Sequence, residues 1–239
     1  MTTFILVGTN KMITIFGSCR QHSLRDHHNV TNIQEELTYP HYSKEILQAI
    51  RFCKGQKFTP EETKFCFRTG ILNNTPLKST DDIQRQFSQT ELFVVEIASR
   101  LAYEYNGRFV HHILKEDRFG FDNRALIQTR TIEDDELRAD ILEIQRELYP
   151  KPWIIVGHIY TRMSGSRYNL VRSLESIASS LSIPFIDPSR VLSNYKHSDV
   201  YNLEEDTLSH YTPTGNTLIG KEYKRVIQMI LDNKERNSS

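Results

Sequence analysis

The sequence predicts an α/β protein in which helices cover both faces of a central, mostly parallel sheet, forming a three-layer α/β/α sandwich. Short apolar runs rich in β-branched residues alternate along the chain with longer segments whose apolar residues recur at helical spacing. A strand–helix–strand order favours parallel pairing, because the helix carries the chain back across the sheet. No change of composition divides the 239 residues, so we expect residues 1–239 to form one domain.

Four short segments have the pattern of buried strands. Residues 12–17 are apolar, include β-branched and aromatic side chains, and end at a glycine. Residues 92–97 are apolar except for a glutamate, residues 153–157 stop just before a histidine, and residues 184–187 form a shorter run. Parallel strands end at a shared edge of the sheet, so the polar residues that follow them are expected to meet where ligands bind.

Four segments have the apolar spacing of helices that cover a sheet. The first is expected to begin near Ser43, because serine caps exposed amides and the Tyr39-Pro40 step before it disfavours helix. The other three are residues 131–149, 169–181 and 220–231. Residues 1–11 are expected to form an N-terminal extension, and the polar residues 55–90 an insertion over the site.

Composition excludes several classes of partner. Thirty basic and 30 acidic residues and a pI near 7.1 leave no electrostatic footprint for nucleic acid or an anionic membrane surface. No apolar run approaches the length of a membrane span, and the N-terminal run is too short for a signal peptide, so we expect a cytoplasmic protein. The three cysteines fit no zinc pattern and favour a reducing compartment, with Cys53 and Cys66 as structural residues.

Two candidate nucleophiles, Ser18 and Cys19, stand side by side where the first strand becomes a loop. Serine or cysteine is a weak nucleophile until an imidazole accepts its proton, and a third group must orient that imidazole. We prefer Cys19 as the nucleophile, with Ser18 as the alternative. The pKa of the Cys19 thiol is expected to be lowered by His210 or by a helix N-terminus near Ser23.

His210 is the candidate base, because it alone among nine histidines is followed by a Pro/Gly turn and a helical pattern near the end of the chain. Asp206 is the candidate group that orients it. Glu204 and Glu205 lie in the same acidic segment and compete for that role.

These residues resemble the SGNH hydrolases, also called GDSL-like lipases and esterases. The family's first strand ends in Gly-Asp-Ser, and Gly17-Ser18-Cys19 places a cysteine at the position of the serine, as in the GSCFA-type branch and in Gly-Asn-Cys capsule-polysaccharide enzymes. The family's histidine has a glycine five residues beyond it, and His210 and Gly215 reproduce that interval. The sequence departs from the pattern in that Asp206 stands four residues before the histidine rather than three.

The resemblance implies a flavodoxin-like sheet and acyl-transfer chemistry on an acylated carbohydrate. Esterase and O-acyltransferase share one covalent intermediate, so both stay open. No cofactor is required, although acetyl-CoA or CoA is a candidate acyl donor, for which Arg162, Arg167 and Arg172 are the visible basic residues. Ser99 falls where the family's oxyanion-binding asparagine stands.

Other polar residues at strand ends are expected to contact the substrate. They are Arg20, which could clamp an anion, and His41, His158 and Glu96. His111 and His112 are expected at a strand edge, where successive side chains point to opposite faces and cannot share one metal, so no metal site is predicted. Two other functions stay open: a glycosyltransferase that uses Glu96 or Asp187 as base, and a non-catalytic carbohydrate-binding protein.

Overall fold

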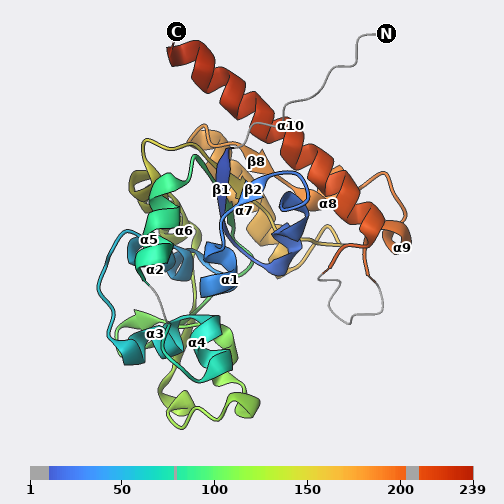
Figure 1. Cartoon of the computed structure of the whole chain (residues 1–239). Helices are drawn as coiled ribbons and strands as arrows, with labels where there is room; N and C mark the ends of the chain where they lie inside the picture. The colour runs from blue at the N-terminus through green and yellow to red at the C-terminus, as the bar shows by residue number, and fades with distance from the viewer. Residues whose placement is uncertain (1–10, 78–79, 203–209, 239) are drawn as a thin grey trace, which may run out of the picture.

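Five parallel strands form the central sheet, in the order β2-β1-β3-β7-β8 (Figure 1). The computed structural model describes residues 11–77, 80–202 and 210–238. The strands are β1 (Met12–Phe16), β2 (Asn29–Val30), β3 (Leu92–Glu96), β7 (Trp153–Val156) and β8 (Phe185–Ile186). Strand β2 lies on one side of β1, and strand β3 lies on the other side. The direction in which the chain winds along the sheet therefore reverses between β1 and β3. This topology confirms the predicted α/β class and its flavodoxin-like strand order.

Side chains alternate across the sheet and supply one apolar core on each face. Phe16, Phe93 and Ile155 point to the first core, whereas Ile15 and Val94 point to the second. Helices on the first face are α1 (Ile33–Leu37), α2 (Ser43–Cys53), α5 (Asp81–Gln89), α6 (Asp134–Leu148) and α7 (Ser166–Ser180). Elements on the second face are the 3-10 helix η1 (Cys19–Leu24), α8 (Pro188–Val191), α9 (His197–Val200) and α10 (Pro213–Ser238).

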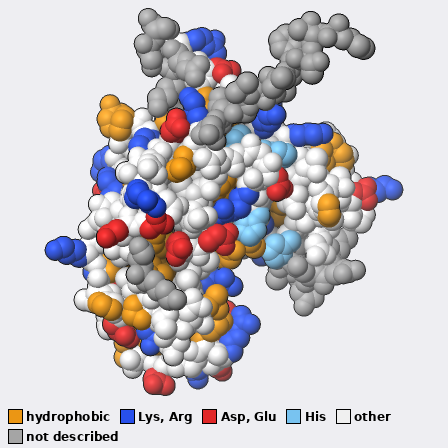
Figure 2. Space-filling model, viewed as in Figure 1, with side chains coloured by type: hydrophobic (Ala, Val, Ile, Leu, Met, Phe, Trp, Pro, Cys, Tyr) orange, Lys and Arg blue, Asp and Glu red, His pale blue; other side chains and the backbone are white. Residues whose placement is uncertain are grey.

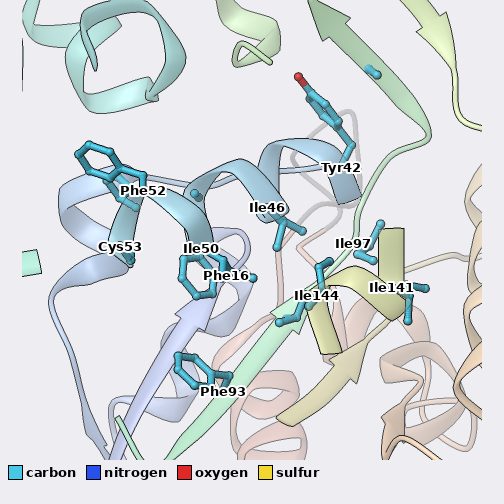
Figure 3. Close-up of a cluster of buried hydrophobic side chains, with 14 of the residues drawn as sticks. Phe16, Tyr42, Ile46, Ile50, Phe52, Cys53, Phe93, Ile97, Ile141 and Ile144 are labelled. Atoms are coloured by element: carbon cyan, nitrogen blue, oxygen red, sulfur yellow. The ribbon is translucent and has the colours of Figure 1, made fainter. Parts of the chain in front are cut away.

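Figure 3 shows how the first core is assembled. Ile46 and Ile50 from α2, and Ile141 and Ile144 from α6, belong to the same buried cluster as Phe16 on the sheet, and Ile50 lies next to the Phe16 ring. All five side chains are at most 1% exposed. Burying a side chain of this size contributes about 1.5–3 kcal/mol, so these contacts hold the two helices against the strands whose ends carry the site.

A smaller lobe extends from one end of the sandwich and is drawn at the bottom of Figure 1. It contains an antiparallel sheet in the order β5-β4-β6 and two short helices. Its elements are α3 (Pro60–Cys66), α4 (Arg68–Asn73), β4 (Leu101–Tyr105), β5 (Arg108–Phe109), β6 (Gln128–Thr131) and the 3-10 helices η2 (His112–Lys115), η3 (Asp117–Phe119) and η4 (Arg124–Leu126). The sequence analysis missed this sheet, because β6 is exposed along its whole length and has no apolar alternation.

The last helix is longer than predicted. It begins at Pro213 rather than near residue 220, since proline suits the first position of a helix and the Thr212 hydroxyl accepts the amide of Gly215 at 3.1 Å. The expected helix over residues 131–149 begins later, at Asp134, because Thr131 belongs to β6.

The placement of His111 and His112 on a strand edge is wrong. The strand β5 ends at Phe109, and His111 caps the 3-10 helix η2 with its ring. Over the described ranges, no helix combines the length and apolarity that crossing a membrane requires. Figure 2 shows acidic and basic side chains interspersed over the viewed face, as the balanced composition leads one to expect.

Candidate active site

A cleft of about 1080 Å³ lies beside the carboxyl ends of β3 and β7. Flavodoxin-like sheets bind ligands next to the strand pair at which winding reverses, here β1 and β3. Four residues from the sequence prediction line this cleft: Arg20, His41, Ser99 and His158. The cleft therefore gathers residues that follow three different strands, together with the loop that precedes α2.

Cys19 and His210 meet although 191 positions separate them in the chain. Neither forms part of the cleft wall, but Arg20, the residue after Cys19, lines the cleft. The Cys19 Sγ lies 3.0 Å from the His210 Nε2. Cys19 is half-buried and is the first residue of η1, immediately after the turn that leaves β1. A thiol and an imidazole in hydrogen-bonding contact are the minimum arrangement for a nucleophile and its base.

Backbone pairing on both sides of residues 203–209 positions His210. The amide of Asn202 donates to the His210 carbonyl at 3.1 Å, and Tyr201 bridges to Tyr211 in antiparallel fashion. Gly215 then allows α10 to pass close to Val200, because a Cβ at residue 215 would lie 2.2 Å from the Val200 carbonyl oxygen. The glycine that follows His210 by five positions thus has a steric role. Asp206 lies outside the described residues, and its orienting role stays a prediction.

Ser18 faces a different partner from its neighbour. Its hydroxyl donates to the Glu96 Oε2 at 2.5 Å, and its backbone amide donates to the same oxygen at 2.8 Å. The hydroxyl also accepts the amide of Arg20 at 3.3 Å, and Ser18 is 3% exposed. The Ser18 hydroxyl therefore lies in the hydrogen-bond network beneath the nucleophile turn, with Glu96 rather than His210 as the acceptor of its proton.

Glu96 is the last residue of β3 and lies beneath the turn instead of on the cleft wall. It is 1% exposed, and its Oε1 accepts the Arg20 Nε at 3.0 Å. Burial by itself raises the pKa of this carboxyl, but the Arg20 charge and hydrogen bonds that include the one from Ser18 outweigh burial and hold the pKa at about 2. A Cβ at Gly17 would lie 2.7 Å from the Glu96 Cβ, so only glycine lets the two strand ends approach this closely.

The expected lowering of the Cys19 pKa is wrong. Burial raises the pKa of the thiol above its ordinary 9.0, and Arg20 and Arg68 offset only part of that rise. The resting side chain is therefore a neutral thiol at pH 7. Proton transfer to His210 has to accompany attack, as it does for a serine nucleophile.

The two cleft histidines on other elements are neutral. Burial is the main reason that the pKa of His41 and that of His158 both fall to about 3. The His158 Nδ1 lies 2.9 Å from the Ile159 carbonyl oxygen, which can only accept, so Nδ1 carries the proton. Its Nε2 is then an acceptor, suited to a hydroxyl or another N–H donor.

Ser99 and Arg167 line the cleft, whereas Asp187 is engaged in structural contacts. The Ser99 amide donates to the His41 carbonyl at 3.0 Å, and the Ser99 hydroxyl oxygen accepts the amide of Leu101 at 3.0 Å, so the hydroxyl can still donate its proton to a substrate. The buried Asp187 accepts the Tyr160 hydroxyl at 2.9 Å and pairs with Arg172. Arg162, Arg167 and Arg172 are the basic residues expected to contact an anionic acyl donor such as acetyl-CoA. Arg167 lines the cleft and Arg162 lines a smaller hollow next to it, whereas Arg172 is the partner of Asp187.

Sequence reasoning missed two contributors to the site. His112 lines the cleft, and its ring lies 4.7 Å from that of His41, centroid to centroid. Arg68, in the segment expected to be an insertion, is near enough for its charge to lower the pKa of Cys19. Neither residue follows a predicted strand, so no local pattern marked them.

The chain matches known proteins over most of its length. A family model described as the TviD N-terminal domain matches residues 11–123 and 116–225. The Vi polysaccharide biosynthesis protein TviD of Salmonella typhi is 26% identical over 262 aligned residues, which cover 90% of this chain and 31% of that protein. The chain thus spans about a third of its curated relative.

Solved structures with similar folds include two acyl-ester hydrolases. A lipase/acylhydrolase from Enterococcus faecalis has 16% identity, a TM-score of 0.44, and coverage of 91% of this chain and 95% of that one. A catalytic mutant of Axe2, an acetylxylan esterase from Geobacillus stearothermophilus, has 10% identity, a TM-score of 0.42, and coverage of 92% and 94%. Because the family model spans nearly all the described residues, from the first strand into the last helix, the chain belongs to the TviD N-terminal domain family.

Proposed function

We propose that this protein is an acyl-transfer enzyme, an esterase or O-acyltransferase, that uses Cys19 as nucleophile and His210 as base on an acylated carbohydrate or polysaccharide. The observation that carries the proposal is the 3.0 Å contact between the Cys19 Sγ and the His210 Nε2, next to Arg20 in the wall of a large cleft. Ser18 is assigned no nucleophilic role, since its hydroxyl donates to Glu96.

The reaction begins when the Cys19 sulfur attacks the carbonyl carbon of the acyl donor and the thiol proton passes to the His210 Nε2. The tetrahedral intermediate collapses to a thioester on Cys19, and the leaving alkoxide or thiolate takes the proton back from His210. Water or a sugar hydroxyl then attacks the thioester while His210 accepts its proton. The C–S bond breaks, the acyl group leaves on the attacking oxygen, and the Cys19 sulfur takes the proton back from His210. Attack by water makes the enzyme an esterase, and attack by a sugar makes it a transferase.

Two groups are candidates to stabilise the oxyanion. The backbone N–H of Cys19 is directed at its own sulfur and lowers the thiol pKa, so it lies beside the reacting atom. The Ser99 hydroxyl faces the same cleft. One such donor contributes about 2.7–4 kcal/mol to transition-state stabilisation in a site that excludes water.

The substrate class rests on the relative and on particular side chains of the cleft. The curated relative is named as a polysaccharide biosynthesis protein. The cleft lining includes hydroxyl side chains and the neutral imidazole of His158, which pair well with sugar hydroxyls. Acetyl-CoA is the proposed donor for transfer, and Arg167, which lines the cleft, is the proposed contact for its phosphates.

Activity of matched variants tests the assignment. Hydrolysis of p-nitrophenyl acetate, and acetyl transfer from acetyl-CoA to a polysaccharide, are measured for Cys19→Ala, His210→Ala and Ser18→Ala. Loss of the nucleophile or of its base is expected to lower kcat/KM by at least about 100-fold, the lower end of what general acid–base catalysis supplies. Ser18→Ala is expected to keep most activity. Full activity in Cys19→Ala would overturn the assignment.

A further inference from the structure

Three imidazoles converge at the rim of the cleft, outside the Cys19–His210 pair. One nitrogen from each of His41, His111 and His112 lies within 4.8 Å of the other two. The ring centroids are 4.9 Å apart for His41 and His111, 4.7 Å for His41 and His112, and 4.3 Å for the adjacent pair. Two segments far apart in the chain, the loop before α2 and the turn after β5, thus bring their histidines together.

The hydrogen bonds of the His111 ring determine which of its two nitrogens has a lone pair that could bind a metal. Its Nε2 donates to the Tyr39 carbonyl at 3.1 Å, so its Nδ1 carries a lone pair. A ring N–H bound to a backbone carbonyl is the usual outer support of a metal-binding histidine. The lone pair now accepts the Ile113 amide at 3.3 Å, a longer contact that an ion at Nδ1 would replace.

The backbone around the cluster is strained and firmly held. Thr38 and Tyr39 adopt φ values of 41° and 51°, a region that non-glycine residues seldom occupy. This strained segment places the Tyr39 carbonyl within hydrogen-bonding distance of the His111 ring, and His41 follows Tyr39 by two residues. The His41 carbonyl accepts the amides of Ala98 and Ser99, and its own amide donates to Glu45 at 2.7 Å. Strain that surrounding contacts maintain is concentrated at functional sites.

We propose that His41, His111 and His112 form a binding site for a transition-metal dication, with Zn²⁺ as the best fit, at the rim of the cleft. Three imidazole nitrogens are a recognised zinc ligand set that leaves a fourth position open. His41 and His112 line the cleft, so that position would face the substrate. The proposal is independent of the acyl-transfer chemistry, because it involves neither Cys19 nor His210.

Binding requires the three nitrogens to move closer together. Zinc–nitrogen bonds of about 2.0–2.1 Å in a tetrahedron place nitrogens about 3.4 Å apart, against the 4.8 Å limit seen here. Rotation of the His41 and His112 rings, which are half-buried, supplies this movement. Two positive charges oppose a cation: Arg68 acts on all three histidines, and Arg20 acts on His41. Two negative charges favour it: Glu96 acts on His41, and Glu116 acts on His112.

The test measures Zn²⁺ binding to the full chain by calorimetry and by competition with a chromophoric chelator. Because Cys19 and His210 could themselves bind zinc, every measurement is made in both the native protein and a Cys19→Ser background. His41→Gln and His112→Gln each remove one ligand but keep a polar side chain of similar size. His197→Gln, an exposed histidine on α9 away from the cluster, is the matched control. The visible spectrum of bound Co²⁺ reports the ligand type.

The proposal expects one Zn²⁺ per chain in the Cys19→Ser background, with affinity reduced at least about 10-fold in His41→Gln and in His112→Gln. His197→Gln should bind like its parent, and bound Co²⁺ should show a tetrahedral spectrum without a thiolate charge-transfer band. Circular dichroism without metal checks that each variant is folded. Binding that disappears with Cys19→Ser, or that persists unchanged in both His41→Gln and His112→Gln, would overturn the proposal. Its failure would leave the esterase and transferase assays unaffected.

Discussion

At the scale of single residues, the choice between two adjacent nucleophiles depends on what each side chain faces. The Ser18 hydroxyl donates a hydrogen bond to the buried carboxylate of Glu96, whereas the Cys19 sulfur contacts the His210 ring. The sequence predicted both the strand end and the preference for cysteine. It could not reveal the contact with Glu96, because 78 positions separate that residue from Ser18 and only the pairing of β1 with β3 brings them together.

The protonation state of Cys19 yields a pH prediction. Because burial raises the pKa of this thiol above 9.0, its alkylation by iodoacetamide should be slow at pH 7 and should accelerate as the pH rises through 9 and beyond. Cys53 and Cys66, both buried with pKa values raised far more, should react still more slowly. Peptide mass spectrometry over a pH series measures all three rates. A rate for Cys19 that is already at its plateau below pH 7 would show a preformed thiolate and contradict this account.

Glu96 is expected to couple stability to pH. Its pKa lies below its unfolded value, so its ionised form stabilises the fold fully above about pH 5, and that contribution is lost as the pH falls toward 2. Glu96→Gln leaves Arg20 buried without its counter-charge and should cost about 3–5 kcal/mol at pH 7. Urea unfolding of both proteins from pH 7 to pH 3 measures this difference, which should shrink on acidification. A constant difference across the series would argue against an ionised Glu96.

At the scale of elements, the start of α10 and the residues that follow α9 position His210. The amide of Asn202 donates to the His210 carbonyl, and the amide of Thr212 donates to the Val200 carbonyl. Sequence periodicity indicated a final helix but placed its start seven residues late, because the first turns of α10 pack through Gly215 against the Val200 carbonyl rather than through an apolar stripe. The interval between His210 and Gly215, by contrast, was visible in the sequence.

Gly215→Ala is expected to disturb both stability and activity. A Cβ placed 2.2 Å from the Val200 carbonyl oxygen forces α10 away from the residues that pair with His210, and steric changes of this kind cost about 1–3 kcal/mol. Because the Cys19–His210 contact depends on the same segment, kcat/KM should fall more than the loss of stability alone explains. Thr214→Ala, one residue earlier and exposed, is the control. Thermal unfolding and p-nitrophenyl acetate hydrolysis measure the two effects, and equal activity in both variants would contradict the positioning role.

At the scale of the whole molecule, the reversal of winding between β1 and β3 explains where the cleft lies. Strands β1, β3 and β7 were predictable, because each is a short apolar run bounded by polar residues. Arg20, Ser99 and His158, which follow these three strands, line one cleft at their shared edge. The smaller lobe was not predictable. Its strands are short, and β6 is exposed along its whole length. Only tertiary contacts bring His112 of this lobe to the cleft.

The most direct test of the central claim is whether an acyl group becomes attached to Cys19. The native chain is incubated briefly with acetyl-CoA or p-nitrophenyl acetate, quenched in acid and digested, and the peptides that contain Ser18, Cys19, Cys53 and Cys66 are examined by mass spectrometry. The account predicts one acetyl group on Cys19 as a thioester, removed by hydroxylamine and absent from His210→Ala. An acetyl group on Ser18, or no labelling of Cys19 in a protein that turns over the same donor, would contradict it.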